Sequence, residues 1–143
     1  MSAFDSAAAI RMRIGDFTFT GRLDAQSTPE SAALIANLLP LERNALHARW
    51  SGEAAWVPLG PLREMRPENA TAHPRPGQIL LYAGIHSEPE LLIPYGACAF
   101  RSRAGMLAGS PVIVLDAGEP ALREMGEMLL WKGAQAFRLE RME

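Results

Sequence analysis

Two charged residues four positions apart suggest a binding site. Arg49 and Glu53 flank the pair Ser51-Gly52, which is typical of a tight turn. A guanidinium held near a carboxylate presents a planar fork that binds a carboxylate or a carbonyl group. The competing interpretation is a surface ion pair that holds a hairpin together and contributes about 0–1 kcal/mol. We predict that Arg49 anchors a ligand and that Glu53 orients the Arg49 guanidinium.

Aromatic residues near this turn can form the walls of a pocket. The chain has five Phe, three Trp and two Tyr, and four of these ten residues are Trp50, Trp56, Tyr82 and Tyr95. Trp and Tyr each offer a large flat surface and one polar group, which suits a small-molecule site. The alternative is that two of them belong to the core and another to an oligomer contact. We expect Trp56 and Tyr95 to line the pocket.

The sequence lacks the common metal, nucleophile and phosphate motifs. No two of the three histidines are four positions apart, and Cys98 is the single cysteine, so no zinc-ligand spacing occurs. There is no Gly-x-Ser-x-Gly motif and no glycine-rich phosphate loop. Cys98 lies in an apolar segment, where a structural thiol is expected. We predict no metal and no cofactor.

Composition and charge argue against some classes of binding partner. The 143 residues are 48% hydrophobic and 21% charged, which is ordinary for a globular protein of one domain. Fourteen basic and sixteen acidic side chains give a net charge of −2, which does not suit binding to nucleic acid or to an anionic membrane. The N-terminus has no secretory-signal pattern, and no apolar run approaches the roughly 20 residues that span a bilayer. With one cysteine, we expect a cytoplasmic protein.

Alternating apolar and polar residues predict most of the strands. Residues 10–14 and 17–23 alternate on either side of Gly15-Asp16 and predict a hairpin. Residues 42–50 and 53–57 predict a second hairpin, which places Arg49 and Glu53 near its turn. Further strands are expected at 79–82, 91–93, 97–100, 112–115 and 134–141.

Two helices are predicted from their end signals. Thr28-Pro29-Glu30 combines a hydroxyl cap, a proline in the first turn and an acidic residue, and Pro40 ends this helix. A second helix begins at Gly118-Glu119-Pro120 and ends at Gly133. Between the strands, residues 59–78 form a long irregular connection, of a kind that is usually functional or packed on itself.

About eight short strands and two helices without internal repeats predict a mainly β fold. We expect a closed eight-stranded antiparallel barrel with two capping helices, because closure removes exposed sheet edges. Residues 1–9 are expected to be a mobile tail, and residues 10–143 a single domain.

Several segments of the chain resemble known sequences. Those that resemble the cyclophilins are Glu68-Asn69, His73, Pro76-Gly77-Gln78-Ile79-Leu80, Ala83-Gly84 and Met106-Leu107-Ala108-Gly109-Ser110-Pro111-Val112-Ile113-Val114. Those that are similar to bacterial cyclophilin-like proteins of unknown function (the domain of unknown function 3830 family) are Leu46-His47-Ala48-Arg49-Trp50-Ser51-Gly52-Glu53-Ala54, Gly77-Gln78-Ile79-Leu80-Leu81-Tyr82 and Pro94-Tyr95-Gly96. The resemblance covers roughly residues 10–141 and implies a cyclophilin-like eight-stranded barrel with two helices.

The cyclophilin resemblance also implies positions for a prolyl-isomerase site. Arg49 matches the arginine that contacts the substrate near the prolyl nitrogen. Met106 stands at the position of the pocket tryptophan and Pro111 at that of the histidine. The pocket phenylalanine and glutamine fall on Ala54 and Val57, although a shorter hairpin would bring Trp56 to the phenylalanine position. The missing glutamine and histidine remove polar contacts worth about 1 kcal/mol each, which argues against isomerase activity.

Three functions follow from these residues. The preferred one is binding of a small organic ligand or peptide in a side pocket formed by Arg49, Glu53, Trp56, Tyr95 and Met106. One alternative is a diverged peptidyl-prolyl isomerase that uses the same arginine. The other is a structural protein that self-associates through the second helix, whose apolar residues include Met125, Met128, Leu129 and Trp131. A homo-oligomer is expected in addition to the preferred function.

Overall fold

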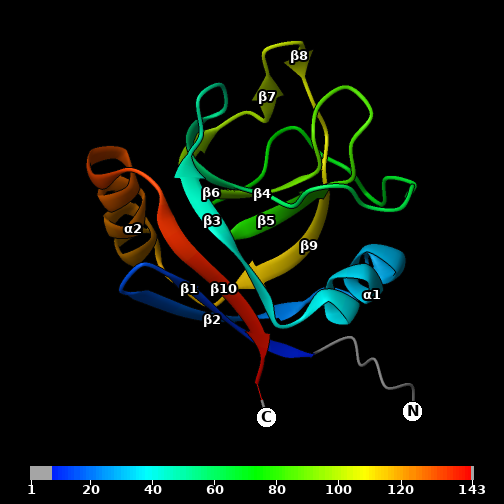
Figure 1. The fold of residues 1–143 in the computed structure, drawn as a ribbon, viewed down its shortest axis with the longest axis horizontal. Coiled ribbons are helices and arrows are strands. Elements are labelled where there is room, and N and C mark those ends of the chain that lie inside the picture. Colours follow the sequence, from blue (N-terminus) through cyan, green and yellow to red (C-terminus); the bar gives the residue numbers. More distant parts are fainter. Residues whose placement is uncertain (1–7, 143) are drawn as a thin grey trace.

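The computed structural model describes residues 8–142, and in this part of the chain eight antiparallel strands close into a barrel (Figure 1). These strands are β1 (Ala9–Ile14), β2 (Phe17–Leu23), β3 (Leu41–His47), β4 (Gly52–Pro58), β5 (Gln78–Tyr82), β6 (Glu90–Cys98), β9 (Ser110–Leu115) and β10 (Gln135–Arg141). Around the barrel they follow the order β1-β10-β3-β4-β6-β5-β9-β2. The predicted closed eight-stranded antiparallel barrel is confirmed.

Two helices lie on opposite sides of this barrel (Figure 1) and bury their apolar faces in it. Helix α1 (Pro29–Leu38) joins β2 to β3, and α2 (Glu119–Lys132) joins β9 to β10. Both helices carry the predicted proline in the first turn, and Gly133 follows the second at a φ of 84°. Thr28 stands at the predicted N-cap, but its hydroxyl donates to the Asp24 carbonyl oxygen and does not cap the helix. Ile35 of α1 and Leu122 and Met125 of α2 belong to the interior core.

The barrel has a core inside and a second core on its outer face. Ala55 and Val57 of β4 point into the interior core, whereas Ala54 of the same strand belongs to the second core. Since successive side chains of a strand point to opposite faces, the second core lies outside the barrel, over β4, β5 and β6. Its members are Ala54, Leu80, Tyr82, Leu92, Phe100 and Leu107. The segment after β6, which includes β7 (Arg101–Ser102) and β8 (Gly105–Met106), therefore covers this face.

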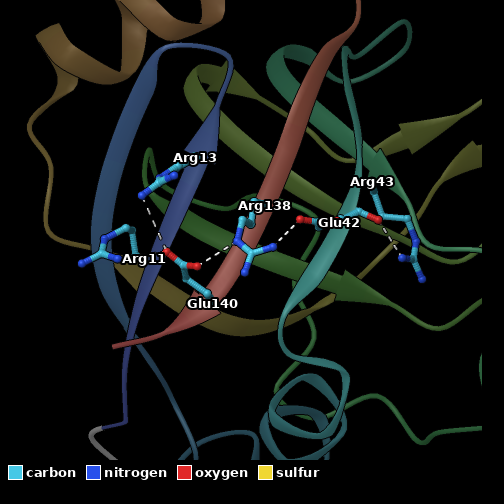
Figure 2. A network of polar contacts seen from close by, with 6 residues as sticks. All are labelled: Arg11, Arg13, Glu42, Arg43, Arg138 and Glu140. Carbon is cyan, nitrogen blue, oxygen red and sulfur yellow. Dashed lines mark hydrogen bonds and ion pairs between the residues drawn. The ribbon is translucent and has the colours of Figure 1, made fainter. Parts of the chain in front are cut away.

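A ladder of charged side chains crosses β1, β10 and β3 on the outer surface (Figure 2). Arg11 lies directly opposite Glu140 in the register, and its Nη1 is 2.9 Å from the Glu140 Oε2. Arg138 pairs with Glu140 at 2.8 Å and with Glu42, the residue opposite Arg138 on β3. These arginines lower the pKa of Glu140. Cross-strand pairs of opposite charge stabilise neighbouring strands, so the ladder helps to hold β10 in the barrel.

The structure differs from the sequence prediction at two strands and at the N-terminus. β3 ends at His47 instead of residue 50, so Arg49 lies in the loop that leads to β4. Residues 97–100 form no separate strand, because β6 continues to Cys98. Residues 1–7 of the expected tail lie outside the described residues, and Ala9 already pairs with Arg22.

Candidate functional site

A cavity of about 320 Å³ opens on the outer face of the barrel, next to the second core. It lies at the lower end of the range of about 300–1,000 Å³ that is usual for ligand pockets. We call it the Arg49 cavity. Its lining residues are Ala48, Arg49, Trp50, Ser51, Trp56, Ser87, Glu88, Glu90, Leu92, Arg101, Ser102 and Arg103. A neighbouring hollow near Met65 and Tyr82 measures about 40 Å³, which is room for only a few waters.

Three segments that are far apart in sequence build the Arg49 cavity. The loop between β3 and β4 contributes Arg49 and Trp50, and Trp56 follows on β4. The segment before β6 contributes Ser87 and Glu88, and the strand itself contributes Glu90 and Leu92. The β7 region contributes Arg101 and Arg103. The structure thus brings together Arg49 and Trp56, two of the residues that the sequence singled out. Arg101 and Arg103 join them only through the fold.

Ser51 fixes the loop that carries Arg49. Its hydroxyl accepts a hydrogen bond from the backbone amide of Arg101 at 3.0 Å and lies 3.2 Å from the carbonyl oxygen of the same residue. The next residue, Gly52, has a φ of 95°, and a Cβ there would lie 2.7 Å from the Ala97 carbonyl oxygen. Only glycine fits at this position without strain. The arginine loop and the β7 segment are therefore held together beside the cavity.

Charged groups of both signs line the Arg49 cavity without pairing to one another. The side chains of Arg49, Arg101, Arg103 and Glu88 are exposed, whereas Glu90 is 7% exposed. Among the residues that the structure describes, none of these five takes part in an ion pair within 4.0 Å. Within residues 8–142 the cavity therefore offers guanidinium groups and the carboxyl group of a largely buried residue, none of which forms an ion pair.

Glu90 is the buried acidic group of the site. It stands opposite Tyr82 of β5 and Pro58 of β4 in the register, and its side chain shares the outer face with Leu92. Within residues 8–142 no group donates a hydrogen bond to its carboxyl. Burial and, to a smaller extent, the nearby charge of Glu88 raise the pKa of Glu90 to about 8. Most Glu90 side chains are consequently protonated at pH 7.

Sequence reasoning did not single out Glu90. The predicted apolar strand at 91–93 begins one residue after it. The available signal was its spacing of two from Leu92, which places an acid on the same face of the strand as an apolar residue. That spacing alone does not predict burial, because it does not show which other segments pack on the outer face of β6.

Glu53 and Tyr95 lie in a different cluster, between α2 and the barrel. Arg123 of α2 donates two hydrogen bonds of 3.1 Å to the Glu53 carboxylate, and the Ala97 amide donates a third of 2.8 Å. The Arg123 bonds are the main reason that the pKa of Glu53 falls to about 2. The Arg123 guanidinium also lies 5.7 Å from the centre of the Tyr95 ring. Tyr95 Oη is 2.7 Å from His47 Nε2.

This cluster corrects the predicted Arg49–Glu53 ion pair. The strand register shifts between Gly52 and Ala54, and Glu53 is directed toward α2. Its carboxylate is satisfied by Arg123, and neither Glu53 nor Tyr95 lines the Arg49 cavity. Sequence reasoning missed Arg123 because that residue lies 70 positions away on a helix.

Other residues with predicted roles also lie away from the cavity. Met106 is 46% exposed on β8 and is not a lining residue. Pro111, which matches the cyclophilin histidine, is buried in β9 opposite Leu80. Burial raises the pKa of the Cys98 thiol to about 11, so this thiol stays protonated at neutral pH. In the described part of the chain no three His, Cys, Asp or Glu residues are grouped so that they can hold a metal ion.

Comparisons with known proteins place the chain by sequence and by fold. A family model described as "Protein of unknown function (DUF3830)" matches residues 10–141. Curated proteins gave no match. Across residues 8–142, no helix has the length and apolar character needed to cross a membrane.

Two solved structures share the fold. One is titled "Structure of McbB in complex with tryptophan"; it is 22% identical, has a TM-score of 0.74, and matches 92% of this chain. This chain spans 44% of the length of that McbB chain. The other is the solution structure of the hypothetical protein AF2241 from Archaeoglobus fulgidus, which is 13% identical with a TM-score of 0.63. That match covers 99% of this chain and 100% of the other.

Proposed function

The chain belongs to the DUF3830 family of proteins of unknown function, and we propose that it binds a small organic carboxylate in the Arg49 cavity. The observation that carries this proposal is a set of three arginines around one cavity, Arg49, Arg101 and Arg103, none of which forms an ion pair in the part of the chain that the structure describes. A guanidinium forms two parallel hydrogen bonds with a carboxylate, and this geometry gives both affinity and orientation.

The charge balance of the cavity favours an anion. Below pH 8 Glu90 is mainly protonated, so the three arginines are opposed by the single charge of Glu88. A concave site with an excess of one charge concentrates ligands of the opposite charge. The excess of positive charge from the arginines attracts a ligand that carries a carboxylate.

The apolar walls favour a ligand that also has an apolar part. Trp50, Trp56 and Leu92 line the same cavity, and Leu92 belongs to the second core. Flat indole surfaces suit aromatic or planar groups. The McbB structure of similar fold was determined in complex with tryptophan, which combines an aromatic ring with a carboxylate. Aromatic carboxylates are therefore the first ligands to test.

Replacing Arg49 with alanine is expected to weaken carboxylate binding by about 10–100-fold. A hydrogen bond to a charged group contributes about 1.5–3 kcal/mol, and 1.4 kcal/mol corresponds to a factor of ten. Isothermal titration calorimetry with indole-3-propionate measures the loss. Arg63→Ala, an exposed arginine of the loop before β5 and outside the cavity lining, is the matched control and should bind like the wild type.

Two results would contradict this function. One is the absence of binding by any of a panel of aromatic and aliphatic carboxylates. The other is equal binding by Arg49→Ala and the wild type. Acceleration of prolyl-peptide isomerisation that disappears in Arg49→Ala would favour the diverged isomerase instead.

Self-association through α2 is a second proposal. Leu130 and Trp131 are 54% and 82% exposed at the end of this helix. Adjacent exposed apolar residues of this size favour a protein contact. We expect sedimentation to show an oligomer at micromolar concentration and Trp131→Ser to shift it toward monomer. A wild-type monomer under these conditions would contradict the proposal.

A further inference from the structure

We propose that the ligand of the Arg49 cavity carries a cationic amine in addition to its carboxylate, as an α-amino acid does, and that Glu90 binds this amine. The inference rests on the proposed function and deepens it. It makes Glu90 the residue that distinguishes an amino acid from the corresponding simple acid.

The first support is the separation of charge within the cavity. The arginines come from the loop before β4 and from the β7 region, whereas Glu88 and Glu90 come from the segment at the start of β6. In the region described by the structure, no arginine of the cavity lies within 4.0 Å of either acid. Elsewhere on the same protein, oppositely charged neighbours do pair, as Arg123 pairs with Glu53 and Arg138 with Glu140. A ligand with both charges would satisfy both groups in the cavity at once.

The second support is the state of the Glu90 side chain. It is 7% exposed, it lines the cavity, and no described protein group donates a hydrogen bond to it. Among the described residues no fully buried polar side-chain atom lacks a partner, so the Glu90 carboxyl oxygens keep contact with the cavity, where a ligand can reach them. An ammonium group supplies three hydrogen-bond donors and a positive charge.

The third support is that the neighbouring charges orient such a ligand. Glu88 repels a ligand carboxylate from the acidic side of the cavity and attracts an amine to it. The three arginines attract the ligand carboxylate to their side of the cavity and repel the amine. Trp50 and Trp56 remain available for the apolar part of the ligand. An amino acid would therefore enter in one orientation.

Amine binding would be coupled to release of a proton. Burial keeps the Glu90 carboxyl protonated at pH 7, and the charged groups around it are Glu88 and the arginines of the cavity, with Tyr82 and Pro58 on the flanking strands. When the ammonium binds, the carboxyl loses its proton to solvent and forms an ion pair with the amine. Ligand binding should therefore strengthen between pH 6 and pH 8.

The test compares tryptophan with two ligands that each lack one of its charged groups. Tryptophan carries both groups, indole-3-propionate only the carboxylate, and tryptamine only the amine. We expect the wild type to bind tryptophan at least tenfold more tightly than either of the other two. Glu90→Gln should bind tryptophan and indole-3-propionate equally, and Glu124→Gln, an exposed acid on α2, should behave like the wild type.

The outcomes separate this inference from the proposed function. If the wild type binds tryptophan and indole-3-propionate equally, and both depend on Arg49, the carboxylate site stands and the role of Glu90 is overturned. If none of the three binds, and phenylalanine and 3-phenylpropionate do not bind either, both proposals are overturned. Calorimetry at pH 7 in buffers of different ionisation enthalpy gives a second readout. Proton release should accompany tryptophan binding to the wild type and be absent in Glu90→Gln.

Discussion

Glu90→Gln is expected to stabilise the protein at alkaline pH and to leave its stability unchanged near pH 4. Burial raises the pKa of Glu90 from 4.5 to about 8 in the folded state. Below pH 4.5 the carboxyl is protonated in both the folded and the unfolded chain, so it has no ionisation cost. As the pH rises toward 8, the unfolded chain loses this proton first, and the wild type loses stability. Glutamine does not titrate and avoids this loss.

The expected size of the stabilisation follows from the shift in the pKa of Glu90. Each unit of pKa difference corresponds to about 1.4 kcal/mol, which gives an upper limit of about 5 kcal/mol above pH 8. For a chain of this length that corresponds to a rise in melting temperature of up to about 15 °C. Melting curves of the wild type and Glu90→Gln should coincide near pH 4 and separate steadily up to pH 9.

The control for this prediction is Glu88→Gln. Glu88 is exposed, and it acts on Glu90 only as a neighbouring negative charge. Its replacement should lower the pKa of Glu90 slightly and raise the melting temperature at pH 9 by much less than Glu90→Gln. If the melting temperatures of the wild type and Glu90→Gln change in parallel from pH 4 to pH 9, ionisation of Glu90 does not destabilise the folded state. If Glu90→Gln melts at a lower temperature than the wild type at all pH values, the Glu90 carboxyl makes a hydrogen bond that the glutamine amide cannot replace.

Local patterns were sufficient to predict the barrel. The β1–β2 hairpin alternates around Gly15, and α1 begins at the predicted proline, because both depend on neighbours within a few residues. The position of Arg49 beside Trp56 was also predictable, since the two residues flank one hairpin. Even the shorter β3 did not separate them, because the loop that follows is tied to Arg101.

The rest of the site depends on contacts between distant segments. Glu53 was assigned to Arg49 from proximity in sequence, but the register shift after Gly52 turns it toward Arg123. Glu90 shares its cavity with residues from two other parts of the chain, and no neighbour in sequence marks it as buried. An acid next to an apolar strand is ordinarily solvated, and no local pattern marks the exception.

Gly126→Ala is expected to destabilise the protein although alanine is the better helix former. Gly126 lies in α2, and a Cβ at this position would be 2.3 Å from two atoms of the Tyr95 ring and 2.4 Å from a third. Alanine gains about 1 kcal/mol of helix propensity over glycine. Overfilling a packed contact typically costs about 1–3 kcal/mol. The balance depends on whether Tyr95 or α2 can move.

Neither partner of this contact is free to move. The Tyr95 hydroxyl is held by His47 at 2.7 Å, and Arg123, one turn before Gly126, ties α2 to Glu53. Leu122 and Met125 of the helix are fully buried in the barrel core. Relief of the clash would therefore break a hydrogen bond or lift the helix from the core. We expect an overfilling cost at the upper end of that range. After the gain in helix propensity is subtracted, the net loss is about 2 kcal/mol, and the melting temperature is lower by roughly 5 °C.

A second substitution tests whether the contact with Tyr95 is the cause. In a Tyr95→Leu background the aromatic ring is absent, so Gly126→Ala should cost little or become stabilising through its helix propensity. Glu124→Ala, at an exposed position on the same helix, should change the melting temperature only slightly. If Gly126→Ala raises the melting temperature of the wild type, α2 can shift on the barrel without cost. The cluster of Glu53, Arg123, Tyr95 and His47 would then not hold α2 in place.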